Sequence, residues 1–209
     1  MCAQGLFLER MKIMWDLESK YMDSINIFTD ANTHNIGFVV DGEEGDDGWK
    51  KEAKYDSVTL NELDAIRYAA KNIDKIFDTG KFSLADARIV IFYSDNIDAI
   101  RAVQSCILAT NCLPPDKDRL DIHSDEAKHI LSKIQKHFGT IIDDYALGFD
   151  IVYVPAHAIN YKEAKDRFKR NNCKDLVSEF KEMKKANKKK YIKQLMLGND
   201  MVDRYIKER

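Results

Sequence analysis

The sequence predicts an α/β fold in which a mixed five-stranded sheet is flanked by helices. Three short strand patterns come first, and the tight turns between them are typical of an antiparallel meander. An uninterrupted apolar run follows at 89–93, which indicates a strand that is buried on both faces, usually in parallel pairing, and 149–154 is expected to be another buried strand. Helical patterns separate these two strands, so the expected order is β-β-β-α-β-α-α-β-α.

The first half of the chain holds the meander and one helix. Ser57 and Thr59 are both suited to cap that helix, whose apolar residues recur at helical spacing until Gly80. The meander strands are expected at 25–30, 37–40 and 49–55.

The second half is mainly helical between the two buried strands and after them. A helix is expected to begin directly after the fourth strand, at Asn96. Ser124 is expected to cap a strongly amphipathic helix that Gly139 ends. Beyond His157 the chain is expected to be helical and basic, with a break at Leu197-Gly198-Asn199.

Length and composition indicate one globular domain. The chain has 209 residues, of which 44% are hydrophobic and 33% charged. We expect an N-terminal helix or arm at 1–22 and a single domain over 23–209. No apolar run approaches the ~20 residues that span a bilayer, so no membrane association is expected. The start lacks a secretion-signal pattern, and the four cysteines form no Cys-x-x-Cys pair, so we expect reduced thiols in a cytoplasmic protein.

Charge is distributed unevenly along the chain. Residues 158–209 hold 16 basic and 8 acidic residues, a net +8, whereas the remainder is net −10. Such an asymmetry suggests that the C-terminal quarter meets a polyanion. The alternative is that the lysines of 184–193 form only a solvated helix face, and charge alone does not separate the two.

Two of the expected strands end alike, in Phe28-Thr29-Asp30 and Tyr93-Ser94-Asp95. In open α/β sheets the functional crevice lies beyond the carboxyl ends of the strands. If these strands are parallel neighbours, two carboxylates lie side by side, where they repel each other and are costly to bury. A hard divalent cation resolves both problems, and oxygen ligands favour magnesium or manganese over zinc. The alternative is that each aspartate caps a following turn or helix.

Glu62 lies in the first or second turn of the helix after the meander. Thr59-x-x-Glu62 also has the form of a capping box, in which the glutamate would bond the helix end and perform no chemistry. Its spacing alone leaves both interpretations open.

Five segments occur in order along the chain. Together they resemble the five motifs of type-1 ribonuclease H, and the last two are especially similar to the ribonuclease H domain of retroviral reverse transcriptases. The resemblance extends from about residue 24 to the C-terminus, and it implies a ribonuclease H-like sheet of three antiparallel strands followed by two parallel ones. The segments are Phe28-Thr29-Asp30, Glu62-Leu63-Asp64-Ala65-Ile66, Ser94-Asp95-Asn96, Val154-Pro155-Ala156-His157 and Gly198-Asn199-Asp200-Met201-Val202-Asp203.

The resemblance implies roles for individual residues. Asp30, Glu62 and Asp95 would be ligands of two magnesium ions, with manganese as the alternative metal, and Asp203 would be the fourth ligand. His157 matches a mobile histidine near the scissile phosphate. In the family two ions about 3.5–4 Å apart activate the attacking water and stabilise the leaving oxygen. Contacts with nucleic acid are implied for Asn32, Asn96 and Asn199.

The chain departs from the family pattern in two places. The residue after the first aspartate is Ala31 where the family usually has glycine. The fourth ligand has two candidates: Asp166 has nearly the usual spacing from His157 but lacks Gly-Asn, whereas Asp203 has the full motif. We favour Asp203, because Asn199 and Asp203 share one helix face and Gly-Asn is expected to open that helix.

If Asp203 is the ligand, residues 158–197 form a helical, basic insertion. By analogy with family members that carry an added basic element, this insertion would track the nucleic-acid backbone with salt-sensitive, sequence-independent affinity. The residues expected to do so are Lys185, Lys188, Lys189 and Lys190.

The function that the resemblance implies is endonucleolytic hydrolysis of the RNA strand of RNA–DNA hybrids, which leaves 5′-phosphate and 3′-hydroxyl ends. Contacts with RNA 2′-hydroxyls would give the preference for hybrids. Two alternatives share the fold: a DNA-acting nuclease of the resolvase, transposase or exonuclease type, and an inactive nucleic-acid-binding module. Protein partners are not predicted.

Overall fold

The structure is a computed structural model that describes residues 24–40, 48–78, 87–108 and 121–208. The helix or arm expected at 1–22 lies outside these residues. Five strands form one sheet in the order β3-β2-β1-β4-β5, in which β1, β2 and β3 pair antiparallel and β1, β4 and β5 pair parallel. The predicted fold class is therefore confirmed. The strands are β1 (Ser24–Ala31), β2 (Asn35–Val40), β3 (Gly48–Glu52), β4 (Ile89–Ser94) and β5 (Gly148–Tyr153).

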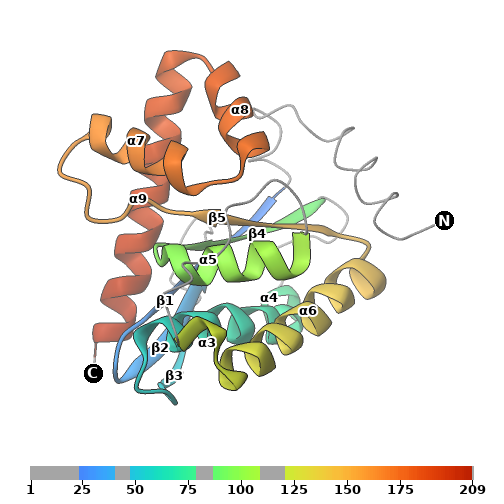
Figure 1. The fold of residues 1–209 in the computed structure, drawn as a ribbon. Helices are drawn as coiled ribbons and strands as arrows, with labels where there is room; N and C mark the ends of the chain where they lie inside the picture. Colours follow the sequence, from blue (N-terminus) through green and yellow to red (C-terminus); the bar gives the residue numbers. More distant parts are fainter. Residues whose placement is uncertain (1–23, 41–47, 79–86, 109–120, 209) are drawn as a thin grey trace.

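Helices cover both faces of the sheet (Figure 1). One face carries α3 (Val58–Lys71), α4 (Ile73–Asp78), α5 (Ile97–Val103) and α6 (Asp125–Tyr145). The other carries α7 (Tyr161–Asn171), α8 (Lys174–Glu182) and α9 (Lys185–Lys207). A π-helical turn, Gln104–Leu108, extends α5, and a 3₁₀ turn, Asp121–His123, precedes α6.

Side-chain alternation in the central strands divides the core between the two helical layers. Ile27 of β1 and Phe92 of β4 belong to the core beneath α3 and α6. Phe28 and Tyr93, one residue further along each strand, belong to the core beneath α9, where their rings stack 4.6 Å apart. Both faces of β1 and β4 are therefore buried, which suits the apolar run of β4, whereas β1 also buries the polar side chains of Asn26 and Thr29.

Helix ends follow the predicted capping residues only in part. The hydroxyls of Ser57 and Ser124 accept hydrogen bonds at the starts of α3 and α6, as expected. The expectation that Gly139 ends α6 is wrong: the helix continues to Tyr145 and ends at Ala146, whose φ of 54° is left-handed. A Cβ at Gly139 would meet nothing within 4 Å, so neither packing nor a turn requires glycine there.

The expected break at Leu197-Gly198-Asn199 is also wrong, since α9 is continuous from Lys185 to Lys207. Gly198 has a different role. A Cβ at this position would lie 2.3 Å from the ring of Phe28, far inside van der Waals contact. The glycine therefore lets α9 pack directly on β1, which brings the C-terminal half of the helix to the ends of the central strands.

Two further expectations concern the chain as a whole. No helix in the described ranges has the length and apolar content to cross a bilayer. Cys106 is a free, exposed thiol, but Cys173, at the start of α8, is disulfide-bonded, so the expectation of reduced thiols is wrong for Cys173.

Substitution of Gly198 by alanine tests this close approach. Helix propensity alone would stabilise the variant by about 1 kcal/mol. We expect the overlap with the stacked Phe28 ring to prevail, with a net loss of about 1–3 kcal/mol in the free energy of unfolding. Gly139→Ala in α6 is the matched control and should stabilise by up to about 1 kcal/mol. Urea denaturation of both variants measures the difference, and equal stabilisation of the two would contradict the packing role.

Candidate metal-binding active site

The centre of the sheet brings two aspartates together. Phe28 of β1 pairs with Tyr93 of β4 in parallel register, so Asp30 and Asp95, each two residues further on, lie at the same edge of the sheet. Asp30 is 7% exposed, and the side chain of Asp95 is 22% exposed. The matched strand ends seen in the sequence therefore become neighbouring carboxylates at the carboxyl ends of parallel strands.

Glu62 completes a triad with these two residues. The N-cap of α3 is Ser57, so the capping box considered for Thr59 and Glu62 does not start this helix. Glu62 is 2% exposed; its Oε1 accepts from the Ala31 amide and its Oε2 from the Ser94 hydroxyl, both at 3.2 Å. One carboxylate oxygen from each of Asp30, Glu62 and Asp95 lies within 4.8 Å of the others.

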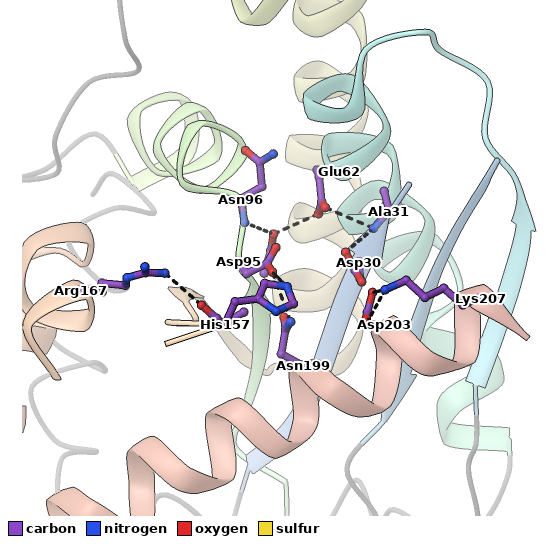
Figure 2. A network of polar contacts seen from close by, with 12 residues as sticks. Asp30, Ala31, Glu62, Asp95, Asn96, His157, Arg167, Asn199, Asp203 and Lys207 are labelled. Carbon is purple, nitrogen blue, oxygen red and sulfur yellow. Dashed lines mark hydrogen bonds and ion pairs between the residues drawn. The ribbon is translucent and has the colours of Figure 1, made fainter. Parts of the chain in front are cut away.

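Neutral groups hold the triad in place. The Ala31 amide also donates to Asp30 Oδ1 at 2.8 Å, and Asn199 Nδ2 donates to Asp95 Oδ2 at 3.3 Å (Figure 2). The Ser94 hydroxyl accepts from the Asn96 amide at 3.1 Å, which directs its own proton toward Glu62. These donors orient the carboxylates without cancelling their charge.

The pKa values of all three carboxylates are raised, chiefly by burial. Burial, followed by the charge of Asp95, raises the pKa of Asp30 from 3.8 to about 7. Burial and the two aspartates raise the pKa of Glu62 well above its ordinary value, and burial raises that of Asp95. Desolvated, mutually repelling carboxylate oxygens are a donor set that suits a hard divalent cation. The residues therefore fit the magnesium or manganese ion that the sequence motifs imply.

Helix α9 adds two residues from the opposite face of the sheet. Asn199 is 1% exposed, and its Oδ1 is buried without a hydrogen-bond partner among the described residues. Asp203 lies one turn later, and its charge is among those that raise the pKa values of Asp30 and Asp95. Asp166, the other candidate for a fourth ligand, lies exposed on α7. Asn199 and Asp203 share a helix face as expected, but in the C-terminal half of α9 and not at a helix start.

His157 stands at the edge of the cluster. Its side chain is 72% exposed, with Nε2 4.0 Å from Asp95 Oδ2, and its φ of 54° is left-handed. Arg167 of α7 pairs with Glu163 and donates from Nη1 to the Ala156 carbonyl at 3.2 Å, which braces the loop directly before the histidine. Sequence reasoning missed Arg167 in this role, although the Glu163–Arg167 spacing is a recognisable helical ion pair.

The remaining predicted site residues lie around the triad or further along α9. The Oδ1 of Asn32 accepts from two amides, those of His34 and Asn35, and so forms the turn between β1 and β2. Asn96 caps α5. The four predicted lysines lie on the first two turns of α9, where most are exposed: Lys185, Lys188, Lys189 and Lys190.

Comparisons with known proteins add little to this geometry. No protein-family model matches the chain, and no curated protein matches it. Among solved structures, RNase H1 from the halophilic archaeon Halobacterium salinarum NRC-1 is 15% identical, over 63% of this chain and 86% of that chain, with a TM-score of 0.37. At these values the likeness carries no functional argument, and the fold rests on the strand order itself.

The raised pKa of Asp30 predicts how the metal-free protein responds to pH. The folded state keeps a proton that the unfolded state releases, so this contribution to stability is complete below pH 3.8 and is lost as pH rises to about 7. In chelator we expect Asp30→Asn to gain stability relative to the unsubstituted protein across that window. Asp166→Asn, at an exposed carboxylate, is the control. Parallel stability curves for Asp30→Asn and the unsubstituted protein would contradict the repulsion.

Proposed function

We propose that the protein is a divalent-metal-dependent endonuclease that hydrolyses the RNA strand of RNA–DNA hybrids. The observation that supports this most strongly is the buried triad of Asp30, Glu62 and Asp95 at the carboxyl ends of β1 and β4. The choice of a hybrid substrate rests on the resemblance of the sequence motifs to type-1 ribonuclease H. The products would carry 5′-phosphate and 3′-hydroxyl ends.

The triad and Asp203 are the residues that would hold the metal. When bound, magnesium or manganese would supply activation of the attacking water and stabilisation of the leaving oxygen. The protein's own contribution is orientation: Ser94 and the Ala31 amide fix both oxygens of Glu62, and Asn199 fixes Asp95 from the other face. Asn199 is 1% exposed, so its part in this proposal is to position Asp95. The nucleic acid would instead contact exposed residues beside the triad, such as His157.

His157 is the proposed mobile group at the scissile phosphate. Its exposed ring borders the triad through Asp95 and is free of the packing that holds the carboxylates. An imidazole in this position can bear a proton near the leaving group and can move away as the product departs.

The proposed path for the nucleic acid continues along α9. Lys188 precedes Asn199 by eleven residues, about three helical turns or ~16 Å, and so lies on the same side of the helix. Exposed Lys185 lies about one turn before it, whereas exposed Lys189 and Lys190 project from other sides of the helix. These four lysines, called the basic cluster below, suit contacts with phosphates, which give affinity without sequence preference.

Cleavage assays with labelled substrates test the function. We expect the full chain to cut the RNA strand of a hybrid in magnesium, and to leave duplex DNA, duplex RNA and every substrate in chelator intact. Cutting of duplex DNA would instead favour the DNA-acting alternative. Binding of the hybrid without cutting would favour an inactive nucleic-acid-binding module.

Two matched substitutions in the same assay test the fourth ligand. We expect Asp203→Asn to reduce the cleavage rate by at least about two orders of magnitude, because loss of a ligand would weaken the hold on the metal ion that stabilises the leaving oxygen. Asp166→Asn, at an exposed position on α7, should leave the rate within about twofold. The reverse pattern would make Asp166 the ligand and the basic segment a tail.

The basic cluster of four lysines on α9 predicts how hybrid binding depends on salt. Replacing Lys185, Lys188, Lys189 and Lys190 together by alanine should weaken hybrid binding. It should also flatten the slope of log K against log salt, by up to about 0.9 for each phosphate that a lysine no longer neutralises. Fluorescence anisotropy with Asp203→Asn protein and chelator measures binding without cleavage. An unchanged slope would mean that these lysines contact solvent and not nucleic acid.

A further inference from the structure

Lys207 binds the proposed fourth metal ligand directly. Its ammonium group lies 2.6 Å from Asp203 Oδ1 and 2.7 Å from Oδ2, so one cation engages both oxygens of the carboxylate. Figure 2 shows Lys207 reaching back along α9 to Asp203, with Asp30 beside them. The lysine side chain is 60% exposed, whereas that of Asp203 is 24% exposed.

This contact is incompatible with a metal ion on the same carboxylate. Magnesium binds oxygen at about 2.0–2.1 Å and demands near-ideal octahedral geometry, so a bound ion would occupy the space around the oxygens that the ammonium group contacts. Two cations on one carboxylate also repel each other strongly at such short range. A metal ion at Asp203 must therefore displace Lys207, and its long, largely exposed side chain has solvent into which to move.

We propose that Lys207 is a built-in competitor for the metal ion at Asp203 and sets the affinity of that side of the site. This inference rests on the metal-binding function proposed above. With little metal present, the lysine neutralises Asp203 beside the repelling triad. When metal binds, the lysine is released toward solvent. The contact thus makes metal occupancy at Asp203 depend on the free metal concentration, while the three carboxylates of the triad form no hydrogen bond or ion pair with the lysine in the described residues.

The ordinary explanation of the contact is an exposed i, i+4 ion pair that contributes little. The two explanations differ in what the lysine does to metal binding. A merely structural pair would leave metal affinity unchanged when it is removed. A competitor would weaken metal binding only while Asp203 is charged.

Calorimetric titration of the full chain with Mn²⁺ separates them. We expect Lys207→Met, which keeps the apolar stem and removes the charge, to tighten the weaker Mn²⁺ site about two- to fivefold, the fold-change that matches the loss of a surface ion pair. Lys207→Arg, which keeps the charge, should bind Mn²⁺ as the unsubstituted protein does. Lys193→Met, which removes one charge from an exposed position further back on α9, should have no effect.

The Asp203→Asn background supplies the decisive comparison. There we expect Lys207→Met to change Mn²⁺ affinity much less than it does with Asp203 intact. An equal effect in both backgrounds, or none in either, would overturn the competition. Tightening with Asp203 intact in a protein that cuts no hybrid would support the competition while the proposed nuclease activity fails. If Lys207→Met leaves Mn²⁺ affinity unaltered in a protein that cuts hybrid, the nuclease proposal stands and the competition is overturned.

Discussion

The parallel pairing of β1 with β4 is the contact on which the rest of the site depends. It aligns the ends of two buried strands, so that Asp30 and Asp95 lie at the same edge of the sheet. Each face of these strands is covered by a different helical layer, and each layer contributes one part of the cluster. Helix α3 supplies Glu62 from one face, and α9 supplies Asn199 and Asp203 from the other.

The fold was predictable from sequence because local patterns mark most of its strands and helix starts. Strand β4 stands out as an uninterrupted apolar run, β5 is mostly apolar, and helix starts follow serine and asparagine caps. The two errors at glycines have one cause. Gly198 ends nothing and instead fits against Phe28, which lies far away in the chain, and no local rule distinguishes such a glycine from the neutral Gly139. The pairing of Cys173 was likewise beyond any spacing rule.

The carboxylates of the site were predictable from sequence, but most of the contacts that support them were not. Asp30 and Asp95 follow from strand-end logic, whereas Glu62 needed the family resemblance to outweigh a capping box that the structure does not form. The supporting contacts of Ser94 and Arg167 escaped prediction, because their partners are set by strand register and by a loop conformation that spacing does not reveal. Lys207 differs, since its i, i+4 relation to Asp203 is a local signal that was open to notice.

The approach of α9 to β1 at Gly198 has a consequence for the order in which a nascent chain matures. The hydrogen bond from Asn199 to Asp95 joins residues 104 positions apart, and Asp203 lies further still. Synthesis therefore places Asp30, Glu62 and Asp95 in the chain well before Asn199 and Asp203. Because the last two residues lie on α9, the acidic cluster of a nascent chain stays incomplete until that helix has emerged from the ribosome.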